Sequence, residues 1–174
     1  MKKVLIVVDM QNDFIDGSLG SPQAEKTVSE AVKVIERDEW DEVCVTYDTH
    51  TENYLSTHEG KYLPVEHCIR GTDGWKLNSR IKEALEKKEC MTVFEKPTFG
   101  SEKLAVYMKE KKPDEITLCG LCTDICVISN ALLLRAALPE TEISVYEPAC
   151  AGVSEESHEA AITVMKSCQI KIEK

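Results

Sequence analysis

Short apolar runs alternate with segments of helical periodicity along the chain, and this alternation limits the fold more than any other feature of the sequence. The runs are typical of buried strands and occupy residues 4–8, 42–47, 91–94, 115–119, 142–146 and 169–172. Helical segments between them cover residues 22–37, 77–88, 102–112 and 123–137, and Ser154 is a suitable N-cap for a last helix. Strands that alternate with helices form a mostly parallel sheet covered on both faces. We therefore expect an α/β protein, a three-layer α/β/α sandwich with a mostly parallel, Rossmann-like central sheet.

The chain is expected to form a single domain over residues 1–174. Its length is sufficient to bury a core, and no linker, internal repeat or low-complexity tract divides it. The run 4–8 is expected at the centre of the sheet, and the segment 123–137, apolar on almost every face, is expected to be buried. Residues 49–74 are polar and weakly periodic, which predicts a long loop. Long loops in compact domains are commonly functional.

Charge and cysteine content limit the partners and the compartment. A net charge of −10 argues against binding to a phosphate backbone, which needs a basic surface. The first apolar run is too short for a signal peptide, and no stretch approaches the length of a membrane span. We therefore expect a cytoplasmic protein with no nucleic-acid and no membrane partner. The eight cysteines are then expected to be reduced thiols rather than disulfides.

The segment GLCTDICV, residues 120–127, contains the strongest candidate for a catalytic group. A strand-like run enters Gly120, and a helix-like segment that starts near Thr123 carries Cys126 in its first turn. The free N–H groups of a helix start stabilise a thiolate, so we expect a lowered pKa and a nucleophilic cysteine. The same N–H groups can hold an oxyanion. Alternatively, Cys119, Cys122 and Cys126 could hold zinc or an iron–sulfur cluster, although a fourth cysteine at matching spacing is missing.

Two further ionisable residues follow predicted strands. Asp9 ends the first run, and Lys96 follows the run at 91–94. Because chemistry gathers at the carboxyl ends of parallel strands, both are expected near Cys126. There Asp9 could act as a general base and Lys96 could stabilise a thiolate. Taken alone, Asp9 is also typical of a turn, and Lys96 of a solvated charge.

A second group of polar residues suits a divalent metal. Asp48 and His50 lie two positions apart after a strand and point to the same side of an extended backbone. The long loop adds His67 and either Glu59 or His58. Carboxylate and imidazole ligands suit zinc, iron or manganese, with water filling the remaining positions.

The order and the residues of several segments resemble the isochorismatase-like cysteine hydrolase superfamily, whose best-known members are nicotinamidases. The similar segments are VLIVVDMQNDF at 4–14, DTH at 48–50, PVEHCIRGTDGW at 64–75, EKPTFGS at 95–101, GLCTDICV at 120–127 and ACAGVSEESHEAAITVM at 149–165. They cover essentially the whole chain. The resemblance implies an isochorismatase-like hydrolase fold and hydrolysis of a small amide through a thioester on Cys126, with release of ammonia.

The resemblance also implies a role for individual residues. Asp9, Lys96 and Cys126 correspond to the family's catalytic triad, and the backbone N–H groups of Cys122 and Cys126 to its oxyanion hole. The Leu121–Cys122 bond falls where the family has a cis peptide without proline. The metal ligands implied for nicotinamidases are Asp48, His50, His67 and, as the variable ligand, Glu59 with His58 as its competitor. No organic cofactor is implied.

The substrate pocket departs from the nicotinamidase pattern. Nicotinamidases commonly place an aromatic residue before the proline that precedes the ligand histidine, whereas here Leu63 precedes Pro64. An extra residue separates Pro64 from His67. Phe14 keeps one apolar wall, so the expected pocket residues are Phe14 and Leu63. Nicotinamide is therefore one candidate substrate among several small amides.

Three other functions are compatible with parts of the sequence. A carbamoyl or ureido compound could be cleaved by the same triad. Vinyl-ether cleavage of the isochorismatase type belongs to relatives without the nucleophilic cysteine, so Cys126 argues against it. A catalytically silent binding or redox-sensing protein is opposed by the intact Asp–Lys–Cys set. Members of the superfamily are often oligomeric, which predicts a homo-oligomer.

Overall fold

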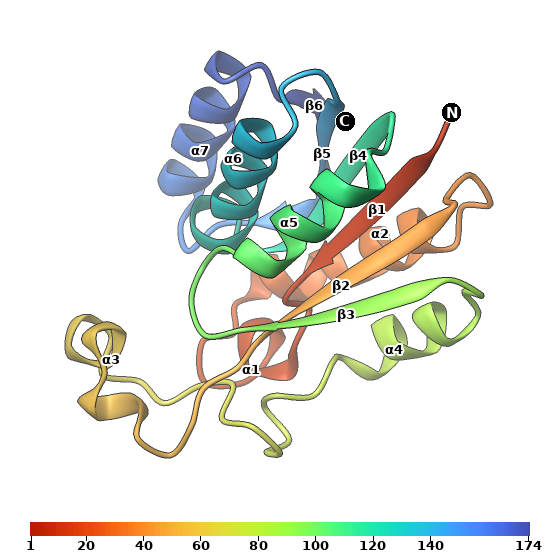
Figure 1. Ribbon diagram of the computed structural model, residues 1–174. Helices are drawn as coiled ribbons and strands as arrows, with labels where there is room; N and C mark the ends of the chain where they lie inside the picture. Colours follow the sequence, from red (N-terminus) through yellow and green to blue (C-terminus); the bar gives the residue numbers. More distant parts are fainter.

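A six-stranded, entirely parallel sheet forms the centre of the computed structural model, which describes residues 1–174 (Figure 1). The strands are β1 (Lys3–Val8), β2 (Glu42–Asp48), β3 (Met91–Lys96), β4 (Glu115–Leu121), β5 (Glu142–Ala151) and β6 (Lys171–Glu173). Their order is β3-β2-β1-β4-β5-β6, so β1 lies inside the sheet as predicted. Chain order reverses between β1 and β4, and such switch points are where α/β sheets bind ligands. The predicted α/β class is confirmed.

Helices cover both faces of the sheet (Figure 1). They are α1 (Asn12–Ile15), α2 (Pro22–Ile35), α3 (His58–Tyr62), α4 (Ser79–Glu86), α5 (Glu102–Lys111), α6 (Ile128–Ala137) and α7 (Glu155–Ser167). One apolar core joins the sheet to α1, α2 and α4, and a second core joins it to α5, α6 and α7. Each face of a central strand such as β1 therefore contacts its own helix layer, which explains why β1 is apolar on both sides. No helix combines the length and hydropathy that a membrane span requires.

The long loop expected at 49–74 contains two short helices. A 3₁₀ turn covers Tyr54–Ser56, and α3 follows it, capped by Thr57 Oγ1, which accepts a 3.0 Å hydrogen bond from the Gly60 N–H. An element of five residues is too short to show helical periodicity, so the sequence pattern did not predict it. Helix α3 projects away from the main body of the protein in Figure 1.

Two other elements differ from their predicted form. Strand β5 continues past Tyr146 to Ala151, and its pairing with β4 shifts register between Leu118 and Gly120. Pro148 lies in this irregular stretch, since proline within a sheet is tolerated at a bulge. The predicted helix 123–137 divides into a π-helical turn at Thr123–Val127 and α6. The segment is less buried than expected, since Leu132 and Leu133 on α6 are only half-buried.

Candidate active site

The three residues expected to act together do lie together at the carboxyl edge of the sheet. Asp9 directly follows β1, Lys96 is the last residue of β3, and Cys126 lies in the π-helical turn after β4. They are 0%, 2% and 5% exposed, respectively. The parallel arrangement of the strands therefore brings residues far apart in the sequence to one buried point.

Lys96 connects the other two side chains. Its Nζ lies 2.6 Å from Asp9 Oδ2 and 3.5 Å from Cys126 Sγ. It also donates a 3.0 Å hydrogen bond to the Thr98 carbonyl. The second oxygen of Asp9 accepts a 2.6 Å hydrogen bond from Thr46 Oγ1 on β2. A carboxylate, an ammonium group and a thiol are thus fixed in mutual contact, which is the geometry of a base-assisted nucleophile.

The backbone around this group has special conformations that the sequence explains. Asp9 has φ +48°, a left-handed conformation that aspartate tolerates better than most residues. Gly120 has φ +123°, and a Cβ added there would lie 2.0 Å from the Val8 carbonyl oxygen. Only glycine therefore lets β4 approach β1 this closely just before the turn with Cys126. The peptide bond between Leu121 and Cys122 is cis, at the position implied by the family resemblance.

The pKa of Cys126 differs from the sequence-based expectation. Burial raises the pKa of this thiol well above its usual value, and the negative charge of Asp9 acts in the same direction. Lys96 lowers the pKa but does not outweigh them. The predicted lowering at a helix start is therefore wrong for this site, because Cys126 is buried, with only 5% of its surface exposed, rather than at an exposed helix end. A thiol of this kind needs a nearby base before it can attack a carbonyl.

Asp9 has the properties of such a base. Burial raises the pKa of its carboxyl group, whereas the positive charge of Lys96 acts against this increase. A raised pKa makes a carboxylate a stronger proton acceptor, and Lys96 keeps it from being protonated too easily. The opposing effects of burial and Lys96 therefore suit proton transfer between Asp9 and Cys126.

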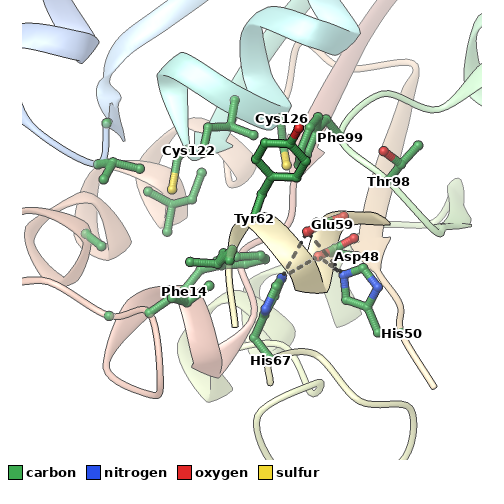
Figure 2. A pocket seen from close by; sticks show the side chains of 18 of the residues that line it. Phe14, Asp48, His50, Glu59, Tyr62, His67, Thr98, Phe99, Cys122 and Cys126 are labelled. Carbon is green, nitrogen blue, oxygen red and sulfur yellow. Dashed lines mark hydrogen bonds and ion pairs between the residues drawn. The ribbon is translucent and has the colours of Figure 1, made fainter. Parts of the chain in front are cut away.

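The second predicted cluster also assembles, next to the first. His50 Nε2 lies 3.0 Å from Asp48 Oδ2 and 3.7 Å from Glu59 Oε1. His67 Nε2 lies 3.4 Å and 3.6 Å from the same two oxygens. Figure 2 shows the four side chains converging: Asp48 ends β2, His50 lies in the loop that follows it, Glu59 lies on α3, and His67 lies in the loop after α3. The cluster includes Glu59 and not its competitor His58.

The chemistry of these donors fits a divalent cation. Two imidazole nitrogens and two carboxylates converge within 4.8 Å, a ligand set suited to zinc, iron or manganese. The Nδ1 atom of His67 lies 2.9 Å from the Val65 carbonyl, a bond that orients Nε2 toward the cluster. Burial lowers the pKa of His67, but hydrogen bonds to Asp48 and Glu59 outweigh it and raise the pKa to about 10. The carboxylates thus make this point strongly favourable for positive charge.

A cavity of about 890 Å³ opens onto both clusters. Phe14 and Leu63 line it, as expected from the sequence. Tyr62 and Phe99 also line it and were not predicted as pocket residues, although Tyr62 directly precedes Leu63 and Phe99 lies within the segment 95–101. Figure 2 shows their rings together with Phe14 around the space in front of Cys126. No lysine or arginine lines the cavity, so its walls are mainly apolar and aromatic apart from the metal-type cluster.

Known proteins share both the sequence pattern and the fold. The family model described as an isochorismatase domain matches residues 3–173. The crystal structure of a nicotinamidase/pyrazinamidase, PncA from Bacillus subtilis, is 30% identical with a TM-score of 0.82, and the match covers 100% of both chains. A zinc complex of the pyrazinamidase of Pyrococcus horikoshii is 26% identical with a TM-score of 0.84, over 100% of this chain and 99% of that one. An N-carbamoylsarcosine amidase from Thermoplasma acidophilum is 26% identical with a TM-score of 0.80, over 100% and 96% of the two chains.

Proposed function

Since the chain belongs to the isochorismatase family and is a nicotinamidase-like amidohydrolase, we propose that its substrates are small aromatic carboxamides of the nicotinamide and pyrazinamide type. The observation that carries this proposal is the apolar cavity with aromatic walls that opens directly onto Cys126. Phe14, Tyr62 and Phe99 offer the flat surfaces that a heteroaromatic ring contacts well. The buried thiol lies at one side of this space, within reach of a carboxamide attached to such a ring.

The first half of the reaction forms a thioester. Asp9 accepts the proton of the Cys126 thiol, and the resulting thiolate attacks the amide carbonyl carbon. Lys96 stabilises both negative groups during this transfer, since its Nζ contacts each of them. The N–H groups of Cys122 and Cys126 stabilise the oxyanion, and losing one such donor typically costs about 3–4 kcal/mol. The tetrahedral intermediate then collapses, the C–N bond breaks, and Asp9 returns the proton to the departing ammonia.

The second half removes the acyl group. Asp9 accepts a proton from a water molecule, which attacks the thioester carbonyl. The C–S bond breaks, the carboxylic acid leaves, and Asp9 returns the proton to the departing Cys126 thiolate. One aspartate therefore acts as base and then as acid in each half of the reaction, which suits a carboxyl group whose pKa is raised by burial.

The four residues Asp48, His50, Glu59 and His67 would hold a divalent metal, and the zinc-bound pyrazinamidase among the structural neighbours supports zinc as one choice. When bound, such a metal orients a substrate or supplies an activated water. The protein's own contribution is to hold these four ligand side chains together in the lining of the cavity. Lys96 Nζ lies 3.6 Å from Asp48 Oδ1 and so links this cluster to the triad.

Hydrolysis of an N-carbamoyl amino acid is the alternative on the same triad. Such a substrate carries a carboxylate, which protein sites usually bind through arginine or lysine. The cavity lining contains neither residue. No lysine or arginine is therefore available for that carboxylate, whereas the aromatic walls suit a neutral aromatic carboxamide.

Ammonia release from a panel of amides tests the proposal. We expect turnover of nicotinamide and pyrazinamide, and little or none of N-carbamoylglycine. Cys126→Ser should abolish ammonia release, whereas Cys90→Ser, at an exposed cysteine outside the cavity, should leave it unchanged. Full activity in Cys126→Ser would reject the nucleophile, and turnover restricted to carbamoyl compounds would reject the substrate class.

A further inference from the structure

Asn130 connects two segments of the site that are distant in sequence. It lies on α6, four residues after Cys126, and is 1% exposed. Its Nδ2 donates hydrogen bonds to the Cys126 carbonyl at 2.8 Å and to the Phe99 carbonyl at 3.2 Å. Its Oδ1 accepts a 2.9 Å hydrogen bond from the Ser101 N–H. One buried amide group therefore joins the turn with the nucleophile to the loop after Lys96.

The loop that Asn130 holds is a thin wall. Pro97, Thr98 and Phe99 line the active-site cavity on one side. The same three residues line a second cavity of about 700 Å³, which also contacts α6, on the other side. Phe99 is 44% exposed, so packing restrains it weakly. Directed hydrogen bonds must then fix the wall, and these are the bonds from Asn130 and the bond from Lys96 Nζ to the Thr98 carbonyl.

We propose that Asn130 is a positioning residue that sets the distance between the Cys126 nucleophile and the Phe99 wall of the substrate cavity. The proposal rests on the proposed function for the identity of the ring that Phe99 contacts. Without the amide group, two buried carbonyls and one N–H lose their partner, and the wall can move relative to Cys126. Misplacement of reacting groups by about 1 Å can reduce a rate roughly a hundredfold. Loss of Asn130 should therefore affect both turnover and the affinity for an aromatic substrate.

Two substitutions test this role. Asn130→Ala removes all three hydrogen bonds. Asn130→Asp keeps the size and the bond from the Ser101 N–H, but an ionised carboxylate cannot donate to either carbonyl. Ser144→Ala is the matched control, because it also removes a buried hydrogen bond, the 2.9 Å contact with Thr117, outside the cavity.

The first readout is the reactivity of Cys126 and needs no substrate. Each protein is alkylated with iodoacetamide and, separately, with N-phenyliodoacetamide, and peptide mass spectrometry gives the rate at Cys126 relative to exposed Cys90 in the same molecule. The preference of Cys126 is the ratio of its alkylation rate with N-phenyliodoacetamide to its rate with iodoacetamide. We expect this ratio to fall roughly tenfold in both Asn130 variants. The second readout is the kinetics with nicotinamide, where kcat should fall, KM should rise, and kcat/KM should fall about a hundredfold.

The positioning role of Asn130 and the proposed function can fail separately. Unchanged alkylation preference and unchanged kinetics in folded Asn130 variants would overturn the positioning role. Equal losses in Ser144→Ala would overturn it too, as would a failure of both Asn130 variants to fold, since Asn130 would then be a general stability residue. If the wild-type protein hydrolyses no carboxamide, the proposed function fails, and the alkylation preference still decides the role of Asn130.

Discussion

Lys96 contacts two carboxylates and the sulfur of the proposed nucleophile. Its Nζ lies within 3.6 Å of the Asp9 and Asp48 carboxylates and of the Cys126 sulfur. Burial lowers the pKa of the ammonium group, but the nearby negative charges, Asp9 foremost, outweigh burial and raise it. The raised pKa favours the charged form of Lys96. Without this charge, burial and the negative charge of Asp48 would raise the pKa of Asp9 further, opposed by the hydrogen bond from Thr46.

Lys96→Met is expected to reduce kcat/KM by at least about a hundredfold, because general acid–base catalysis typically contributes that much or more. Burial raises the pKa of Asp9 and Lys96 lowers it, so removing Lys96 raises this pKa further. The proposed mechanism needs the base form of Asp9, so wild-type activity should be lost as the pH falls through the pKa of Asp9. In Lys96→Met this loss should begin at a higher pH, which a pH–rate profile measures.

The exposed Lys103 on α5 provides the control for this experiment. Lys103→Met removes a lysine from the same region without touching the triad, so its pH profile should match that of the wild type. An acid limb at the same pH in Lys96→Met and the wild type would show that Lys96 does not control the protonation of Asp9.

At the scale of elements, the close approach of β4 to β1 places the nucleophile turn. The two strands pair from Lys3 with Glu115 to Val8 with Gly120. Gly120→Ala would place a Cβ 2.0 Å from the Val8 carbonyl oxygen on a backbone with φ +123°. We expect a destabilisation of about 3 kcal/mol or more, because both a clash and an unfavourable conformation are introduced. Urea unfolding measures it.

A substitution at Gly71 separates the effect of the steric clash from that of the unfavourable backbone conformation. It also has a positive φ, +83°, but no atom lies within 4 Å of an added Cβ. Gly71→Ala should therefore cost only about 1 kcal/mol, the conformational part alone. Equal losses in the two variants would mean that the contact with β1 adds nothing.

Helix α3 provides the least predictable member of the metal-type cluster, since Glu59 and His58 are adjacent in sequence and only Glu59 joins the cluster. Glu59→Ala should weaken zinc binding by more than about tenfold, because even the partners of metal ligands contribute that much. His58→Ala, one residue away on the same helix, should retain the wild-type affinity. Elemental analysis after dialysis against graded zinc concentrations measures both. The opposite order of affinities would assign the ligand to His58.

The elements that sequence predicted well are those with long periodic patterns. Strand β1 has a run of apolar residues on both faces, and α2 starts at Ser21 and Pro22 as their capping preferences indicate. Helices α1 and α3 have four and five residues, too few for a period to be visible. The π-helical turn at Thr123–Val127 depends on packing against the sheet edge and leaves no signal in the spacing of apolar residues.

At the scale of the whole molecule, the candidate site lies at one edge of the parallel sheet, and a buried structural carboxylate lies at the opposite edge. Strand ends predicted Asp9, Lys96 and Cys126 as neighbours, because the carboxyl ends of all strands meet at one edge. Tyr62, Phe99 and Asn130 could not be placed in this way, since their positions depend on how loops and helices pack over that edge. The opposite edge has a buried carboxylate of its own, Glu42 at the start of β2, which is 3% exposed.

Glu42 lies in a hydrogen-bond network that joins three elements. It accepts hydrogen bonds from the hydroxyl groups of Tyr107 at 2.5 Å and Thr92 at 3.0 Å, and from Lys2 Nζ at 3.4 Å. Burial raises the pKa of this carboxyl group, but the three hydrogen bonds outweigh burial and lower the pKa. A carboxyl group with a lowered pKa in the folded state stabilises that state above the unfolded pKa. This contribution is lost as the pH falls through the folded pKa.

Glu42→Gln should therefore reduce the free energy of unfolding by about 1–3 kcal/mol at pH 7, the usual contribution of hydrogen bonds to a charged group. Below the ordinary glutamate pKa the difference from wild type should shrink, since wild-type Glu42 becomes protonated and loses the same contribution. Urea unfolding at several pH values between 3 and 7 measures this, and kcat should stay unchanged because the network lies at the edge opposite the site. A constant difference at every pH would show that the lost packing of the side chain, rather than its charge, stabilises this end of the sheet.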